Sequence, residues 1–273
     1  MKIGIIGYGS MGKMLLWKFA EEGNIPKESL FAANRTREKL DEARDIATIS
    51  DNRELAQNAE IIFLCIRPSD MKTVLDEIRT AVRPEALIVS LNGSISFRSL
   101  HKIIQNRSAK VIPSLTAEIG RSQTLVCYDP SVTAEDKTAL SVLLQCLGDV
   151  IELPEHEMGM GSELVSCMPG FIASIFDVIC SAAQAHTSIS KEQIVRMVLG
   201  AMSATGDLML RNQMPFEAIV QRVATKGGIT EVGTSVIYEQ FPQTARQLFE
   251  KTLEKRHLTA ETAEKIFENH TES

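Results

Sequence analysis

The stretch that decides the fold is Lys2-Ile3-Gly4-Ile5-Ile6-Gly7-Tyr8-Gly9-Ser10-Met11-Gly12, close to the N-terminus. A short apolar run ends at Gly7, and residues 11–22 after it carry apolar side chains at helical spacing. Glycines spaced Gly-x-Gly-x-x-Gly between a strand and a helix allow a tight turn and a close approach of the backbone to a pyrophosphate. Backbone N–H groups at the helix start then face that anion. We therefore predict a dinucleotide site that uses Gly7, Gly9, Ser10, Met11 and Gly12.

Strand and helix signals alternate through the first half of the chain. The predicted strands cover residues 2–7, 30–34, 61–66, 87–91, 110–112, 124–128 and 150–153. The predicted helices between them cover residues 11–22, 37–44, 51–58, 70–78 and 133–147. Such alternation implies βαβ units, and so an α/β fold with a parallel, doubly wound sheet of the Rossmann type.

After residue 154 the strand signals cease, and the remaining signals are helical. Helices are predicted at residues 156–187, 190–212, 215–223, 228–239 and 242–255, with a kink or break at Pro169-Gly170. The first two are apolar over more of their surface than one small domain can cover. We therefore predict a dinucleotide-binding domain at residues 1–155 and an all-α substrate and dimerisation domain at residues 156–273. The C-terminal helices would form a homodimer, and a higher oligomer of such dimers is left open.

Composition argues against several classes of partner. The 273 residues carry a net charge of −6 and no basic run, so we expect neither nucleic acid nor an anionic membrane surface as partner. The longest uninterrupted apolar stretch, Ile61 to Ile66, is far shorter than the ~20 residues of a membrane helix. The chain enters a strand at Lys2 without an apolar leader, which favours a cytoplasmic protein with a small-molecule substrate. The scattered cysteines and histidines predict reduced thiols and no metal site.

The end of the second predicted strand indicates which dinucleotide is bound. Sites specific for NAD usually place an acidic residue there, on the ribose 2′-hydroxyl. This chain has Ala33-Asn34-Arg35-Thr36 instead. Arg35 can pair with a 2′-phosphate, while Asn34 and Thr36 can donate hydrogen bonds to it. The sequence therefore favours NADPH/NADP as cofactor.

With these segments in view, the chain resembles the pyrroline-5-carboxylate reductases of proline biosynthesis over nearly its whole length. Similar segments are the glycine loop, Asn34-Arg35-Thr36, Arg67-Pro68 where the family has Lys-Pro, Ser90-Leu91-Asn92-Gly93, and Val223-Ala224-Thr225-Lys226-Gly227-Gly228-Ile229-Thr230. The last of these is similar to the family signature Val-Thr-Ser-Pro-Gly-Gly-Thr-Thr. The resemblance implies reduction of Δ1-pyrroline-5-carboxylate to L-proline with NADPH. It also implies further cofactor contacts at Ile66, Arg67, Pro68, Asn92, Gly93 and Ser114.

The segment around Gly227-Gly228 has its own physical reading. Two glycines before a helix can expose consecutive backbone N–H groups, which suit a substrate carboxylate. The resemblance adds that the Thr225 hydroxyl helps to hold the carboxylate and that Thr230 is catalytic, hydrogen-bonding the ring nitrogen. Lys226 would add a cation beside the carboxylate. The protein would then position the reactants and hold their charges, while the cofactor carries the hydride.

Some positions depart from the family pattern. Lys226 replaces a proline, Ser114 stands where the family has asparagine, and residues 166–171 read Ser-Cys-Met-Pro-Gly-Phe in place of Gly-Ser-Gly-Pro-Ala-Tyr. This divergence resembles the reductase-like branch encoded with late competence genes in Gram-positive bacteria. An alternative is therefore a non-catalytic, NADP(H)-binding regulatory homologue linked to competence. A β-hydroxyacid dehydrogenase is disfavoured, because Gly159-x-Gly161 lacks the lysine that this class needs.

Overall fold

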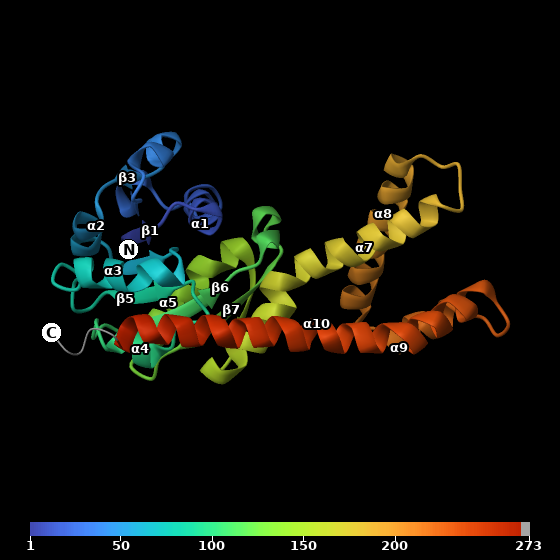
Figure 1. Ribbon diagram of the computed structural model, residues 1–273. Helices are drawn as coiled ribbons and strands as arrows, with labels where there is room; N and C mark the ends of the chain where they lie inside the picture. Colours follow the sequence, from blue (N-terminus) through green and yellow to red (C-terminus); the bar gives the residue numbers. More distant parts are fainter. Residues whose placement is uncertain (269–273) are drawn as a thin grey trace. The chain divides into compact units, whose positions relative to one another are not determined.

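A computed structural model describes residues 1–268 of the chain (Figure 1). It contains two compact units. The first comprises residues 1–169 together with the end of the chain from Leu253, and the second comprises Gly170–Thr252. The two compact units do not coincide with the predicted linear division at residue 155, since the end of the chain belongs to the first unit. That division remains a prediction.

The first unit is built on an eight-stranded sheet with the strand order β3-β2-β1-β4-β5-β6-β7-β8. The strands are β1 (Ile3–Ile6), β2 (Leu30–Ala33), β3 (Thr48–Ile49), β4 (Ile61–Leu64), β5 (Leu87–Ser90), β6 (Ser108–Ile112), β7 (Ser122–Tyr128) and β8 (Gly148–Glu152). The expectation of a parallel sheet is wrong at one pairing, since β7 runs antiparallel to β6. Only residues 113–121 join these strands, with the 3₁₀ helix η3 (Leu115–Ile119) among them. A parallel crossover needs a dozen residues or more.

Helices cover both faces of this sheet. They are α1 (Ser10–Glu21), α2 (Asn52–Asn58), α3 (Pro68–Ile78), α4 (Phe97–His101), α5 (Ala134–Leu144) and α6 (Met158–Ser162), with 3₁₀ turns at η1 (Lys27–Ser29), η2 (Arg37–Ala43), η4 (Gln145–Leu147) and η5 (Glu155–Glu157). Neighbouring residues of β4 enter opposite apolar clusters, Phe63 in one and Leu64 in the other. This alternation follows from the two-residue period of a strand and gives the unit its two cores.

Several short elements escaped prediction, among them the strand β3, the helix α4 and the 3₁₀ turns η1 and η3. The strand β3 has two residues and α4 has five, too few for a clear periodic signal. Residues 37–44 were expected as a helix, and the structure has the 3₁₀ helix η2 there, over Arg37–Ala43. The 3₁₀ form is common in connecting segments, although a run of seven residues is longer than usual.

The second unit is helical, as expected. It contains most of α7 (Met168–Gln184), then α8 (Lys191–Asn212), α9 (Phe216–Val223) and the first part of α10 (Ile229–Glu268). The prediction of two helices at 228–239 and 242–255 is wrong, because α10 continues through Pro242. Its far end is anchored by Ala263 and Phe267, which are buried in the core of the first unit. Tertiary packing of this kind stabilises a helix beyond its local propensity.

The chain also stays helical through Pro169. The irregularity expected there is a π-helical turn, η6 (Glu163–Cys167), directly before α7. Such turns commonly absorb local disruptions of a helix, and proline removes one backbone donor. The predicted break is therefore replaced by a wider turn.

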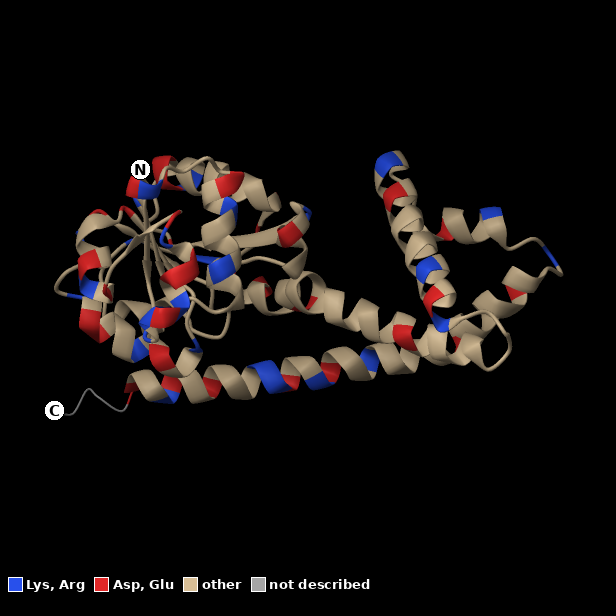
Figure 2. Ribbon diagram, turned by 90° about the horizontal axis from the view of Figure 1, so that it is seen from above, with Lys and Arg blue, Asp and Glu red and all other residues tan. Residues whose placement is uncertain are grey.

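The helical segment around Pro169 is more apolar than the short uninterrupted apolar runs of the sequence indicated. Among the described residues, Glu155–Gln184 is long and apolar enough to cross a membrane by length and composition alone, and 6% of its most apolar window is buried. This corrects the expectation that no stretch reaches that length. Asp177 is the one charged residue of α7, so this helix is tan, the colour of uncharged residues, almost throughout in Figure 2.

Candidate cofactor site

The three glycines of the loop after β1 meet different surroundings. Gly7 has φ +100°, and a Cβ atom there would lie 2.5 Å from the carbonyl oxygen of Cys65. A Cβ atom on Gly12 would lie 1.9 Å from the carbonyl oxygen of Gly7, whereas one on Gly9 would have nothing within 4 Å. Gly7 therefore serves the turn and Gly12 the contact between helix and strand. Gly9 leaves the space by which a ligand can approach the backbone.

The start of α1 adds the donors for an anion. Gly9 is the N-cap residue and offers no side-chain cap, so Ser10, Met11 and Gly12 begin the helix with the backbone N–H groups of its first turn. These groups and the helix dipole favour a negative charge at this point. The loop has the geometry of a pyrophosphate site.

Asn34 links the glycine loop to the end of β2. Its Oδ1 atom accepts a hydrogen bond from the backbone N–H of Tyr8 at 2.9 Å, and its Nδ2 atom donates to the carbonyl oxygen of Thr36 at 2.8 Å. The side-chain amide predicted to contact a 2′-phosphate thus already holds two segments together. Its placement orders the loop that presents Arg35 and Thr36.

A cleft of about 700 Å³ opens where the strand order reverses between β1 and β4. Ligands of doubly wound sheets bind in the crevice at such a switch point. Of the predicted cofactor residues, the lining includes Gly7, Gly9, Asn34, Arg35, Thr36, Ile66 and Arg67. Pro68 follows directly and is the first residue of α3. The structure therefore brings together three segments that are far apart in sequence.

Cations line this cleft on both sides, Arg35 and Lys39 after β2 and Arg67 after β4, and the carboxylates of Asp51, Asp70 and Glu77 also line it. The Arg35 side chain is 87% exposed, and its Nη1 atom lies 3.8 Å from Oδ1 of Asp70. Sequence reasoning missed Lys39, which lies in the 3₁₀ helix η2 and has no local pattern that links it to Arg35. These cations suit the 2′-phosphate of NADP better than the ribose 2′-hydroxyl of NAD, which would donate a hydrogen bond to an acidic side chain.

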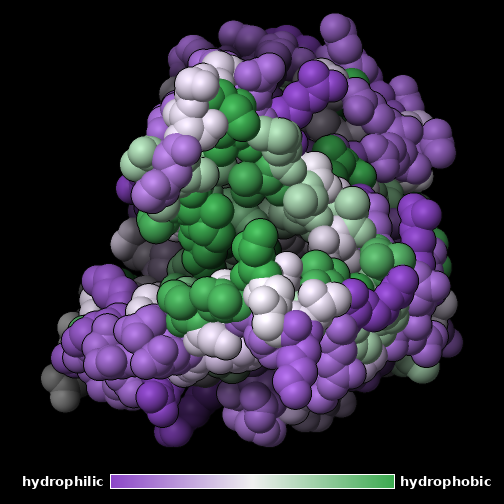
Figure 3. Space-filling view, turned by 90° about the vertical axis from the view of Figure 1, so that its right-hand side faces the viewer, coloured by the Kyte–Doolittle hydropathy of each residue, from purple (hydrophilic) through white to green (hydrophobic). Residues whose placement is uncertain are grey.

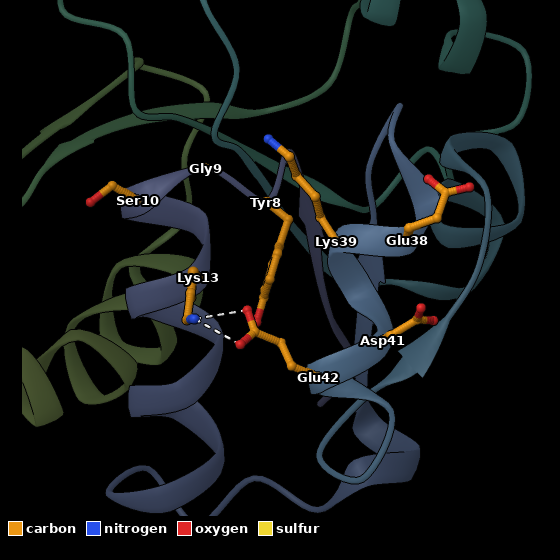
Figure 4. Close-up of a pocket in the computed structure, with 8 residues that line it drawn as sticks. All are labelled: Tyr8, Gly9, Ser10, Lys13, Glu38, Lys39, Asp41 and Glu42. Carbon is orange, nitrogen blue, oxygen red and sulfur yellow. Dashed lines mark hydrogen bonds and ion pairs between the residues drawn. The ribbon is translucent and has the colours of Figure 1, made fainter.

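A second cleft of about 580 Å³ lies between α1 and η2, and Figure 4 shows the residues around it. Lys13 and Tyr8 both point toward Glu42, with 2.8 Å between Nζ of Lys13 and the Glu42 carboxylate. This hydrogen bond raises the pKa of Lys13, while burial is the main cause that raises the pKa of Tyr8. The Lys39 ammonium points away from this ion pair. Because Tyr8, Gly9 and Lys39 line both clefts, the pair braces the wall that they share.

Asn92, Gly93 and Ser114 follow β5 and β6, beyond the main cleft. Asn92 donates its N–H to Oγ of Ser90 at 3.1 Å and accepts from the N–H of Ser94 at 2.9 Å. Ser114 is 2% exposed, and its hydroxyl caps η3 by accepting from the N–H of Thr116. None of the three is among the lining residues of the main cleft. Ser114 shapes the start of η3 rather than presenting its hydroxyl.

The predicted substrate segment lies in the second unit, between α9 and α10. Gly227 has φ +74°, and its N–H donates to the Oε2 atom of Glu231 at 2.6 Å. The N–H of Gly228 donates to the carbonyl oxygen of Thr225 at 2.8 Å. The two donors expected to face a substrate carboxylate are therefore engaged within the segment. A carboxylate does occupy the Gly227 donor, but it is the chain's own.

Comparisons with known proteins cover nearly the whole chain. Residues 2–93 match the family described as NADP oxidoreductase coenzyme F420-dependent, and residues 155–259 match pyrroline-5-carboxylate reductase dimerisation. The chain is 31% identical to pyrroline-5-carboxylate reductase 3 of Bacillus subtilis, over 95% of this chain and 97% of that protein. It is 25% identical to ComE operon protein 4 of the same organism, over 92% and 94%.

Among solved structures, the fold is similar to that of Plasmodium falciparum pyrroline carboxylate reductase with NADP bound. The TM-score is 0.86 at 22% identity, and the match covers 95% of this chain and 98% of that chain. At this identity the likeness shows the fold, which includes the doubly wound sheet and the helical C-terminal region.

Proposed function

Because this chain belongs to the pyrroline-5-carboxylate reductase family, we propose that it reduces Δ1-pyrroline-5-carboxylate to L-proline with NADPH, as a step of proline biosynthesis. The observation that carries the proposal is the cleft at the switch point, with an open glycine loop, Arg35 and Lys39 after β2, and Arg67 after β4. NADPH would supply the hydride. All that the chain must add is binding, orientation and charge compensation.

The residues of the first unit fit this cofactor. The loop from Gly7 to Gly12 would hold the pyrophosphate, and Arg35 with Thr36 would hold the 2′-phosphate, in a loop ordered by Asn34. Ile66, Arg67 and Pro68 line or adjoin the cleft on the β4 side, toward the other half of the dinucleotide. Asn92 and Gly93 follow β5 on that same side, so we place them at the nicotinamide end.

The residues of the second unit would bind the substrate. Thr225, Lys226, Gly227 and Gly228 would hold its carboxylate, and the Thr230 hydroxyl would accept a hydrogen bond from the protonated ring nitrogen. The proton makes the imine carbon electrophilic, and it stays on the nitrogen when the hydride adds to the carbon. Thr230 therefore fixes the orientation of the ring rather than transferring a proton.

We also propose a homodimer formed by the C-terminal helices. Large apolar side chains of α7 and α8 are exposed, including Val178 at 68%, Met197 at 56% and Leu210 at 75%. Figure 3 shows apolar side chains gathered in a hollow of the face that it draws, with hydrophilic side chains around them. Large exposed apolar patches mark interaction surfaces in proteins. Because residues 155–259 match a dimerisation region, a second copy of the chain is the expected partner. We also propose a cytoplasmic location.

The test is an NADPH-oxidation assay with purified protein. Absorbance at 340 nm should fall on addition of pyrroline-5-carboxylate, with L-proline formed in equal amount. NADH should support a much lower rate at the same concentration. Tight binding of NADPH without any turnover would overturn the enzymatic proposal.

A further inference from the structure

The lining of the cofactor cleft carries no net charge, although the cofactor that it would hold is strongly anionic. The described residues that line it include three cations and three carboxylates, namely Arg35, Lys39, Arg67, Asp51, Asp70 and Glu77. NADPH brings a pyrophosphate and a 2′-phosphate, and both groups are negative at neutral pH. The carboxylates therefore weaken the attraction that the cations supply to these phosphates.

Two of the three carboxylates are engaged by their own surroundings. Asp51 is the N-cap residue of α2 and accepts a backbone N–H of the first helical turn at 2.8 Å. Glu77 accepts a hydrogen bond from Nδ2 of Asn52 at 2.7 Å. Asp70 differs, because its side chain accepts no hydrogen bond within the described part of the chain, and its ionic partner there is Arg35.

The contact with Arg35 places Asp70 beside the expected 2′-phosphate. Asp70 lies in the first turn of α3, and its Oδ1 atom is 3.8 Å from Nη1 of Arg35, the side chain proposed to hold that phosphate. Both side chains are accessible to solvent, Arg35 at 87% and Asp70 at 40%. An exposed ion pair of this kind is weak, so either side chain can turn toward a ligand. A carboxylate and a guanidinium therefore reach the same part of the cleft.

We propose that Asp70 is a specificity residue for the 2′ group of the cofactor and narrows the preference for NADPH over NADH. This inference rests on the proposed function, which places NADPH in the cleft. With NADPH bound, the Asp70 carboxylate repels a phosphate that lies well within the ~8–10 Å over which charges act at physiological salt. With NADH bound, the same carboxylate accepts a hydrogen bond from the ribose 2′-hydroxyl. In NAD sites an acidic residue at the end of the second strand has this role, whereas here the acid comes from α3.

Repulsion of the phosphate outweighs any positioning of Arg35 by Asp70. A separation of 3.8 Å is longer than a hydrogen bond, and it joins one nitrogen to one oxygen, so it does not fix the guanidinium as a bidentate pair does. A phosphate monoester, by contrast, carries roughly −1.5 to −2 charges at pH 7. Its interaction with the Asp70 carboxylate is therefore the larger effect and determines the sign.

The experiment removes the charge of Asp70 and compares the two cofactors at saturating pyrroline-5-carboxylate. In Asp70→Asn, which keeps the size of the side chain, we expect KM to fall about threefold for NADPH and to rise about threefold for NADH. The ratio of kcat/KM for NADPH to kcat/KM for NADH should therefore rise about 10-fold. Asp76→Asn removes the same charge from an exposed position of α3 outside the cleft. It is the matched control and should leave the ratio as it is, while thermal melts show that both variants fold.

A conservative variant and added salt test whether the charge itself is responsible. Asp70→Glu keeps the carboxylate and should retain a ratio close to that of the wild type. Raising the ionic strength to about 0.5 M should reduce the gain that Asp70→Asn shows with NADPH, because salt screens the phosphate from the carboxylate. An unchanged ratio in Asp70→Asn, a higher KM for NADPH, or a gain that does not respond to salt would overturn the proposal.

Failure of the proposed function has a different signature. Wild-type protein that binds NADPH without reducing pyrroline-5-carboxylate would refute the reaction, and calorimetry then tests Asp70 by binding alone. Adenosine 2′,5′-bisphosphate and adenosine 5′-monophosphate differ by the 2′-phosphate. We expect Asp70→Asn to bind the bisphosphate about threefold more tightly and the monophosphate no more tightly than the wild type does. Equal changes for the two nucleotides, or none, would contradict the role of Asp70.

Discussion

Gly9 and Gly12, three residues apart in one loop, serve different purposes, and matched substitutions should separate them. Gly12→Ala forces a Cβ atom to 1.9 Å from the carbonyl oxygen of Gly7, so we expect a loss of stability of about 1–3 kcal/mol or more. Gly9→Ala meets open space, so its melting temperature should stay near that of the wild type while NADPH binding weakens about 10-fold. Thermal melts and NADPH titrations give both values. Equal stability losses in the two variants would contradict this division.

Lys39 tests the charge that selects the cofactor. It lines both clefts beside the glycine loop, next to the expected 2′-phosphate. Lys39→Ala should raise KM for NADPH roughly 10-fold and leave KM for NADH nearly unchanged, because only the phosphorylated cofactor carries the additional charge. Arg37→Ala, exposed on the same segment and outside both clefts, is the control. Parallel increases for the two cofactors would place Lys39 outside the specificity site.

Glu231 occupies a donor that the substrate carboxylate is proposed to use. Its side chain accepts the N–H of Gly227 at 2.6 Å, so substrate binding has to displace it. Glu231→Ala should therefore lower KM for pyrroline-5-carboxylate about threefold, in line with the net value of one hydrogen bond. Glu239→Ala, exposed on the same helix, should leave KM as it is. A higher KM in Glu231→Ala would show that this carboxylate supports the site instead.

At the scale of elements, buried thiols in and beside the sheet should make stability sensitive to alkaline pH. Burial raises the pKa of Cys146 in η4 from 9.0 to about 11 and also raises the pKa of Cys127 in β7. The unfolded chain can ionise these thiols above pH 9, whereas the folded chain keeps them protonated to higher pH. Their contribution to stability is therefore complete below pH 9 and is lost as pH rises toward 11. In Cys146→Ala, denaturant midpoints measured at pH 8, 9 and 10 should fall less steeply than in the wild type. An unchanged slope would exclude Cys146 as a source of the effect.

The elements that were predicted well are those whose pattern is local. The apolar runs of β1, β4 and β5 and the amphipathic α1 follow from side-chain periodicity alone. The direction of β7 depends on the length of its connection to β6, and the unbroken course of α10 depends on Ala263 and Phe267 in a core built mostly by the first 130 residues. Such long-range contacts override local signals like Pro242.

At the scale of the whole molecule, the exposed apolar helices should determine the assembly. Val178→Glu places a charge on the apolar surface of α7, where Val178 is 68% exposed in the single chain. We expect the dimer to dissociate or the protein to aggregate, because a charge buried at an apolar interface has no partner. Light scattering coupled to size exclusion measures the mass. Gln184→Glu adds the same charge at an exposed polar position of α7 and should leave the dimer intact.

The sequence by itself determined the glycine loop, the cationic end of β2, the alternation of strands and helices, and the family to which the chain belongs. Each of these depends on residues close together in the chain or on a motif with a stated spacing. Only the tertiary structure decided that Lys39 joins the cofactor cleft, that Asn34 links the loop to β2, and that Glu231 occupies the Gly227 donor. It also decided that Asp70, in the first turn of α3, lies beside Arg35. The physical reason is that hydrogen bonds and charges act through space, and the path of the chain decides which groups come within their reach.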